Sequence, residues 1–142
     1  MRFMVLVKAS PSSEAGDLPS AELLTAMGNF NEEMVKAGVM LSGEGLQPSS
    51  KGARITFSGP RPTVTDGPFP ETKELVAGFW MIQVKSKEDA IAWISRAPFT
   101  DGEVVEIRQV FETEDFPADV MPPEEAAREE RMRDELQRRA KK

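Results

Sequence analysis

The sequence contains no cysteine, no histidine and no tyrosine. Without cysteine the chain has no disulfide, no thiolate nucleophile and no sulfur ligand for zinc or an iron–sulfur cluster. Without histidine it lacks the usual general base near neutral pH and the commonest metal ligand, and without tyrosine it lacks a phenolic acid. Most hydrolases, redox enzymes and zinc enzymes are thereby excluded. We expect no metal site and no resident cofactor, and catalysis would depend on carboxylates, Lys, Arg, hydroxyl groups or backbone amides.

Long apolar runs are absent as well. No stretch approaches the length of about eighteen residues that suggests a membrane helix. The apolar start, residues 1–7, is too short for the h-region of a signal peptide and runs into polar residues without a cleavage site. We therefore expect a cytoplasmic protein without a membrane segment. With 142 residues, 39% of them hydrophobic, the chain can form one domain with a core and at most an appendage.

Basic residues are too few to balance the acidic ones. The chain has 18 Lys and Arg against 24 Asp and Glu, a net charge of −6. Residues 122–142 hold seven basic and six acidic residues, so the preceding part has eleven against eighteen, or −7. A body this acidic repels a phosphate backbone, and we expect no direct binding of nucleic acid.

The hydrophobic pattern predicts strands at residues 2–8, 39–41, 53–57, 63–66, 78–84 and 104–111. One helix is predicted from the N-cap Ser20 to Gly38, and another from the N-cap Ser86 to the stop at Pro98. Residues 10–19 are expected to form a loop. The resulting order is strand–helix–strand, hairpin, strand–helix–strand, which indicates an α+β fold of ferredoxin-like type.

The predicted sheet has a face that the two helices do not cover. Several strands are apolar on both faces, so this second face should also be buried. The simplest partner is a second copy of the chain that packs sheet to sheet. We therefore expect a homodimer.

The end of the chain has a different character. We expect a domain of residues 1–112, followed by a linker and a charged helical tail at residues 113–142. The only large apolar residues after Pro123 are Met132 and Leu136. Acidic and basic residues four apart should support the helix: Glu124 with Arg128, Glu129 with Arg133, Asp134 with Arg138, and Glu135 with Arg139. Because this helix has almost no face to bury, we expect it to be solvated rather than part of a coiled coil.

Residues 66–74, Asp-Gly-Pro-Phe-Pro-Glu-Thr-Lys-Glu, are the most informative motif, and we call them the signature loop. They resemble the DGPF signature of the YCII-related domain family, small cytoplasmic bacterial proteins whose roles are mostly unassigned. The resemblance extends over residues 2–112. The bend at residues 37–39 and the glycine-rich stretch at residues 43–48 support it.

This resemblance implies a dimeric α+β barrel, in which two sheets close around a shared interior. It also implies a functional link to a sigma factor, because such proteins often accompany extracytoplasmic-function sigma factors. The similar YciI branch is thought to use a His–Asp pair in its cleft. This chain has no histidine, so only Asp66 could remain from such a pair.

The signature loop has two interpretations. In the structural one, Asp66 accepts backbone hydrogen bonds, Gly67 provides a positive φ or a close approach, and Phe69 fills the core. In the functional one, Asp66 faces a cleft and the loop amides hold an acidic group of a ligand. Aspartates in turns outnumber catalytic ones, which slightly favours the structural interpretation.

Other polar residues are also candidates for a site. Glu44 lies between two glycines, and is either a catalytic carboxylate or an outward residue of a β-bulge. Arg108 either pairs with Glu106 on the surface or binds a ligand carboxylate. Lys73 is a ligand-binding candidate, although a solvated lysine is the simpler interpretation. The candidate set therefore comprises Asp66 and Glu44 for catalysis and Gly67, Lys73 and Arg108 for ligand binding.

Two classes of function remain. The first is a homodimeric small-molecule-binding or regulatory accessory module that encloses a small acidic ligand. The second is a small acid/base enzyme, such as an isomerase, a lyase or a cofactor-free oxygenase, with Asp66 or Glu44 as the base and Arg108 as the oxyanion partner. The missing histidine, tyrosine and cysteine favour the binding module.

Overall fold

The computed structural model describes residues 1–140 and divides the chain into two compact units, Met1–Val110 and Phe111–Lys142. We describe each unit by itself. In the first unit, the elements follow one another as β1 (Arg2–Lys8), α1 (Pro11–Glu14), α2 (Ala21–Lys36), β2 (Met40–Gly45), η1 (Ser49–Lys51), β3 (Ala53–Thr56), β4 (Thr63–Asp66), η2 (Thr72–Glu74), β5 (Val76–Gln83), α3 (Lys87–Ile94) and β6 (Val105–Gln109). No helix within residues 1–140 is both long and apolar enough to cross a membrane.

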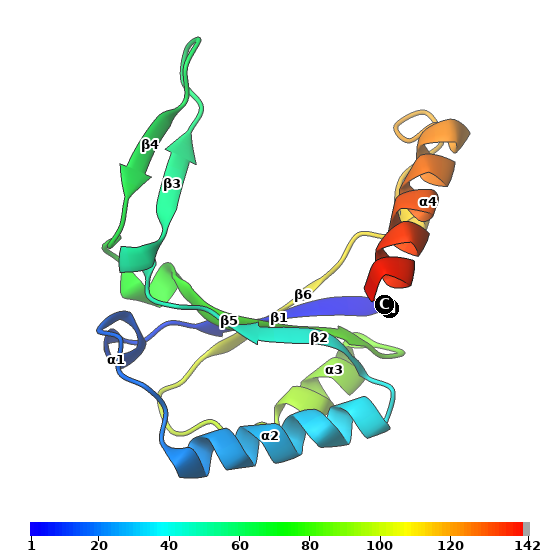
Figure 1. Ribbon diagram of the computed structural model, residues 1–142. Coiled ribbons are helices and arrows are strands. Elements are labelled where there is room, and N and C mark those ends of the chain that lie inside the picture. The colour runs from blue at the N-terminus through cyan, green and yellow to red at the C-terminus, as the bar shows by residue number, and fades with distance from the viewer. Residues whose placement is uncertain (141–142) are drawn as a thin grey trace. The chain divides into compact units, whose positions relative to one another are not determined.

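Four strands of the first unit form an antiparallel sheet in the order β2-β5-β1-β6 (Figure 1). The helices α2 and α3 connect β1 to β2 and β5 to β6, and both lie on one face of the sheet. The predicted α+β fold is confirmed, and the strand order is that of a ferredoxin-like sheet. The strands β3 and β4 form a separate two-stranded hairpin.

The hydrophobic core lies between the sheet and the two helices. Its buried members are Phe3, Val5, Phe30, Met34, Val39, Trp80, Ile82, Ala90 and Ile94. Burying a large apolar side chain stabilises a fold by about 1.5–3 kcal/mol. The indole ring of Trp80 makes edge-on contacts with Phe30 and Phe99, with ring centroids 5.8 and 6.0 Å apart. The pairing of Val5 with Trp80 places both residues on the helix-covered face.

The predicted limits of α2 are confirmed. The side chain of Ser20 accepts a hydrogen bond from the backbone N–H of Leu23, at 3.1 Å. At the other end, Val39 donates to the carbonyl of Met34 and Gly38 donates to that of Val35. These two bonds form a Schellman motif, which satisfies carbonyls that the helix end would leave unpaired.

The prediction of a loop at residues 10–19 is wrong in part, because residues 11–14 form the one-turn helix α1. The hydroxyl of Ser10 accepts from the N–H of Ser13, and the hydroxyl of Ser13 accepts from the N–H of Ser10. Pro11 occupies the first helical turn, where a missing N–H costs nothing. Residues 10–13, Ser-Pro-Ser-Ser, are therefore a helix-start signal inside the segment that was predicted to be a loop.

The irregularity in β2 differs from the expected one. The strand continues through its glycines, and Glu44 pairs in register with Phe79. The register shifts earlier, between Met40 and Ser42. A β-bulge at Glu44, one of the two interpretations that the sequence allowed, is therefore wrong.

The sheet face away from the helices carries apolar side chains. In β1, Phe3 and Val5 point into the core, so Met4 and Leu6 point to the opposite face. Leu6 pairs with Phe79 and Met4 pairs with Met81, which also lie on this face. We call these four residues the bare face of the sheet.

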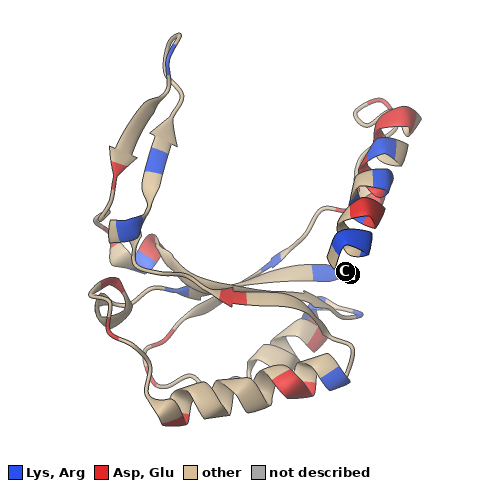
Figure 2. Ribbon diagram, in the orientation of Figure 1, with Lys and Arg blue, Asp and Glu red and all other residues tan. Residues whose placement is uncertain are grey.

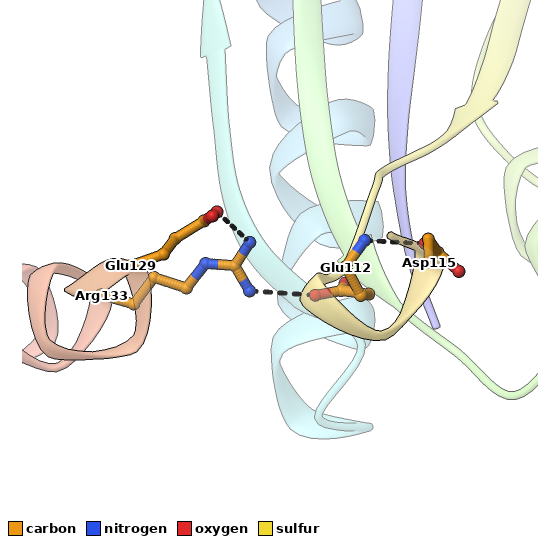
Figure 3. A network of polar contacts seen from close by, with 4 residues as sticks. All are labelled: Glu112, Asp115, Glu129 and Arg133. Carbon is orange, nitrogen blue, oxygen red and sulfur yellow. Dashed lines mark hydrogen bonds and ion pairs between the residues drawn. The ribbon is translucent and has the colours of Figure 1, made fainter. Parts of the chain in front are cut away.

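The second unit consists of η3 (Thr113–Asp115) and α4 (Pro123–Ala140). Acidic and basic residues are interspersed along α4 (Figure 2). Arg133 donates to the carboxylates of Glu112 and Glu129, at 3.0 and 2.9 Å (Figure 3). The hydrogen bond to Glu112 is the main reason why the pKa of Arg133 is raised. Figure 3 also shows the backbone N–H of Glu112 donating to Asp115, which closes a capping box around η3.

Two of the four ion pairs predicted in the tail are confirmed, Glu129 with Arg133 and Glu135 with Arg139. The other two are wrong. Arg128 pairs with Glu125 and Arg138 pairs with Glu135, both three residues away instead of four. Both spacings bring side chains together on a helix surface, so the sequence alone does not distinguish them.

Candidate functional site

A cavity of about 1000 Å³ opens beside the N-terminal half of α2. The segment around α1 and the residues between β2 and η1 form its rim, and α2 and β5 contribute its walls. Sites for small molecules typically have volumes of about 300–1,000 Å³. The cavity is therefore large enough for a small organic molecule.

The walls of the cavity include apolar and aromatic side chains. Leu23 and Met27 line it from α2, and Trp80 and Phe99 line it from the other side. The indole N–H of Trp80 donates to the side-chain oxygen of Asn31, at 2.8 Å. This bond and the contacts with neighbouring rings hold the indole in one orientation.

Gly43 belongs to the same wall. A Cβ atom at this position would lie only 2.6 Å from Cδ1 of Trp80, closer than real side chains approach. The strand therefore needs glycine here, because the indole ring packs directly on its backbone. This requirement explains one of the two glycines that flank Glu44.

The charged residues that line the cavity are mostly acidic. Among the lining residues, Glu14, Asp17, Glu44 and Glu103 are acidic and Lys51 is basic. Glu44 pairs with Phe79, so its side chain leaves the strand on the face away from Trp80. Asp17 accepts a hydrogen bond from Ser12, and Glu103 accepts one from the backbone N–H of Thr100. Across residues 1–140, Glu44 has no side-chain hydrogen bond or ion pair.

Glu14 connects two parts of the cavity rim. Its carboxylate accepts from the backbone N–H of Ser49 at 3.0 Å and from the hydroxyl of Ser49 at 2.5 Å. These two bonds hold α1 against η1. The hydrogen bond from the Ser49 hydroxyl, helped by that from its N–H, lowers the pKa of the Glu14 carboxyl below its ordinary value.

Ser49 also holds the signature loop. Its hydroxyl oxygen accepts a hydrogen bond from the backbone N–H of Phe69, at 3.1 Å. The N–H of Gly67 donates to the carbonyl of Gly52, at 3.0 Å. A Cβ atom at Gly67 would lie 1.8 Å from the carbonyl oxygen of Ser49, so no larger residue fits without a backbone shift. The close approach expected at Gly67 is therefore confirmed.

A model of the YCII-related domain matches residues 1–114. The chain belongs to the YCII-related domain family. No curated protein matches the chain. A similar solved structure is the 5-chloro-2-hydroxyhydroquinone dehydrochlorinase TftG from Burkholderia phenoliruptrix AC1100, in complex with 2,5-dihydroxybenzoquinone. The two chains are 16% identical, the match covers 82% of this chain and 100% of that chain, and the TM-score is 0.41.

In this YCII-related domain protein, the predicted site residues lie apart. Glu44 lines the cavity, whereas Asp66, Gly67, Lys73 and Arg108 do not. Lys73 is exposed in η2. The side chain of Arg108 is 71% exposed, and its guanidinium nitrogen lies 3.4 Å from a carboxylate oxygen of Glu106. Of the two interpretations of Arg108, the structure therefore has the surface pair with Glu106.

The structural interpretation of the signature loop needs two corrections. Within residues 1–140, no hydrogen bond or ion pair involves the Asp66 carboxylate, so its expected bonds to the backbone are absent. Phe69 does not fill the core of the YCII-related domain. Its ring is partly buried and lies under the guanidinium group of Arg54, 4.0 Å from the ring centroid.

Sequence reasoning missed Glu14 and Ser49, which lie 35 residues apart. No local pattern connects residues at that separation. The described residues contain no group of three Asp or Glu that could hold a metal ion, and Cys and His are absent from the sequence. The chemistry that this YCII-related cavity offers is therefore hydrogen bonding, carboxylate charge and apolar contact.

Proposed function

We propose that this YCII-related domain protein is a small-molecule-binding or regulatory accessory module whose ligand occupies the cavity beside α2. The observation that carries this proposal is the cavity itself, with its volume of about 1000 Å³ and its fixed aromatic wall. An apolar cavity with a few polar groups is the usual form of a small-molecule site. The fixed orientation of Trp80 reduces the entropy lost on binding.

The charge of the lining constrains the ligand. Four acidic residues and one basic residue are among those that line the cavity, and this negative balance favours a neutral or cationic ligand over an anionic one. The acidic ligand expected from the sequence stays a prediction, and Lys51 is the single lining residue that would attract it. We propose a ligand with an apolar or aromatic body and a neutral or cationic polar end.

A matched series of probes tests this proposal. Benzylamine, benzyl alcohol and benzoate share a ring and differ in charge, so their affinities, measured by calorimetric titration, report the preference of the cavity. We expect the amine to bind most tightly and benzoate least. The substitution Glu44→Gln should weaken binding of the amine more than binding of the alcohol.

Two tryptophan variants of α2 complete the test. Leu23→Trp places a larger side chain in the cavity and should abolish binding, whereas Val35→Trp, at an exposed position outside the cavity lining, should not. Equal binding by both variants would show that the ligand lies elsewhere. If a broad library of apolar amines and alcohols neither binds nor raises the melting temperature of the parent protein, the binding function is wrong.

We also propose that the protein is a homodimer that buries the bare face, Met4, Leu6, Phe79 and Met81. These apolar side chains lie together on adjacent strands, on the face of the sheet opposite α2 and α3. A second copy that packs sheet to sheet would remove them from water and form a dimeric α+β barrel. The dimer should be visible by sedimentation at micromolar concentration, and Leu6→Arg should give the monomer mass.

A small acid/base enzyme, such as an isomerase, lyase or cofactor-free oxygenase, is the second candidate. The observation in its favour is that Glu44 is among the residues that line the cavity and has no hydrogen-bond partner among the described residues. Because Glu44 starts from the strand face away from Trp80, its carboxylate would have to reach the substrate around the sheet edge. A base needs access to its substrate and a lone pair that is not already engaged. In this case Glu44→Gln would abolish turnover of a bound ligand while its affinity changes little. The same loss in an Asp66→Asn variant would contradict the assignment to Glu44, because Asp66 lies outside the cavity lining.

A further inference from the structure

The hairpin of β3 and β4 has two chemically different faces. Ile55 pairs with Val64, so both side chains lie on one face of the hairpin. Phe57 follows at the next position on that side of the chain. The exposed fractions of these three residues are 57%, 63% and 82%. We call Ile55, Phe57 and Val64 the apolar face of the hairpin.

The opposite face is polar, and one of its residues contacts the signature loop. It carries Arg54, Thr56, Thr63 and Thr65, which form the two cross-strand pairs that alternate with Ile55–Val64. The guanidinium group of Arg54 lies over the ring of Phe69 in the signature loop. The contact between Arg54 and Phe69 lies on the polar face, so it does not cover the apolar face.

An uncovered hairpin of this composition is unusual. Two antiparallel strands are at best marginally stable in water unless another surface packs on them. All residues from 51 to 66 are exposed in the single chain. Strands that expose Ile, Val and Phe also tend to associate with other chains. The apolar face therefore needs a covering surface that the first unit does not supply.

We infer that the apolar face of the hairpin packs on a second copy of this chain, as an arm of the dimer. This inference rests on the homodimer proposed above. The hairpin extends from the sheet on the side opposite α2 and α3, which is the side of the bare face (Figure 1). A second copy that docks on the bare face therefore approaches from the side on which the hairpin stands.

The size of the sheet supports the same conclusion. Four strands of five to eight residues cover about 20 × 20 Å, given about 3.3 Å per residue and about 4.8 Å between strands. A stable interface typically buries about 800 Å² on each partner. The sheet alone is a small platform for such an interface. The arm adds a second apolar contact, so one association would cover both the bare face and the apolar face of the hairpin.

Two triple variants test the inference. The first, Ile55→Ser with Phe57→Ser and Val64→Ser, removes the apolar face. The control, Thr56→Ser with Thr63→Ser and Thr65→Ser, makes three substitutions on the polar face of the same hairpin. Sedimentation equilibrium should show a dimer dissociation constant at least tenfold higher for the first variant and within twofold of the parent for the control. An unchanged dissociation constant in both variants overturns the arm and leaves the sheet-to-sheet dimer intact.

A second measurement does not depend on these variants. Because the chain has no cysteine, Val64→Cys provides a single position for an environment-sensitive dye. The dye emission should shift to the blue as protein concentration rises through the dimer dissociation constant. A dye that stays in water while the dimer forms, or that shifts only when a cell lysate is added, overturns the inference. A parent protein that is monomeric at every concentration contradicts the dimer itself, and the arm with it.

Discussion

The carboxylate of Glu14 accepts two hydrogen bonds from Ser49, one from its N–H at 3.0 Å and one from its hydroxyl at 2.5 Å. The same hydroxyl oxygen accepts from the N–H of Phe69. One serine thus joins α1, η1 and the signature loop. Since residues of both α1 and η1 line the cavity, this serine also determines the shape of the cavity rim.

The Glu14–Ser49 contact predicts a pH dependence of stability. The hydrogen bonds from Ser49 lower the pKa of the folded-state carboxyl below its ordinary value of 4.5. The stabilisation is therefore present above about pH 4.5 and is lost as the pH falls through the folded-state pKa. We expect the parent to melt higher than Glu14→Gln at pH 7 and this difference to shrink as the pH falls below 4.5.

Thermal melts of both proteins between pH 7 and pH 3 measure this effect. Glu130→Gln is the control, because Glu130 is exposed on α4 and makes no hydrogen bond or ion pair within residues 1–140. Its melting curve should follow that of the parent at each pH. If the gap between the parent and Glu14→Gln is the same at both ends of the range, the contact does not titrate as proposed.

Ser49→Ala should destabilise the protein. The substitution removes a donor to Glu14 and the acceptor for the N–H of Phe69 at once. A buried or partly buried hydrogen bond contributes about 0.5–1.5 kcal/mol. We expect a decrease of at least about 1 kcal/mol in the free energy of unfolding, measured by urea denaturation.

The neighbouring serine is a matched control for this prediction. Ser50→Ala should change the free energy of unfolding by less than about 0.5 kcal/mol, as is usual for exposed surface positions. Ser50 is exposed and has no side-chain hydrogen bond among the described residues. Equal effects of the two substitutions would mean that Ser49 does not hold the loop.

Variants of Asp66 test whether this residue contributes to stability or to ligand binding. Because its carboxylate makes no hydrogen bond within residues 1–140, we expect Asp66→Asn and Asp66→Ala to stay within about 0.5 kcal/mol of the parent. Both variants should bind the cavity ligand normally, because Asp66 does not line the cavity. Loss of binding in both, with stability retained, would make Asp66 a site residue. A large loss of stability in Asp66→Ala alone would restore its role as a turn residue.

Removal of residues 122–142 should leave the first unit folded. The large apolar side chains of this segment after Pro123, Met132 and Leu136, are 51% and 65% exposed. Full burial of such a side chain is worth about 1.5–3 kcal/mol, so exposed ones contribute much less. We expect the truncated protein to keep its circular dichroism spectrum apart from the lost helix, and to melt within a few degrees of the parent. A much lower melting temperature would show that α4 stabilises the body.

The local features of the fold could be predicted from the sequence. The N-cap Ser20 and the Schellman motif at Gly38 depend on residues within one helical turn, so their signals lie next to one another in the chain. The strand–helix order follows from apolar periodicity in the same way. These patterns are sufficient to indicate the ferredoxin-like sheet.

The candidate site could not be predicted to the same extent. The bonds between Glu14 and Ser49 join distant residues, and neither residue is unusual in its own surroundings. The cavity wall depends on the indole ring of Trp80 lying on Gly43, which brings together residues of two strands. Glu44 was found because its flanking glycines are a local signal. Asp66 was selected from the signature loop and Arg108 from its place in the last strand, and neither signal shows which way a side chain points.

The hydrogen bond from Trp80 to Asn31 gives the protein a built-in optical reporter. The indole lines the cavity, is nearly inaccessible to solvent and is held in one orientation, so an entering molecule changes its surroundings directly. The second tryptophan, Trp93, does not line the cavity, and the guanidinium group of Arg96 lies over its ring. A Trp93→Phe variant would therefore emit from the cavity wall alone. Its fluorescence would register occupancy in a mixture of unlabelled metabolites, before any candidate molecule has been named.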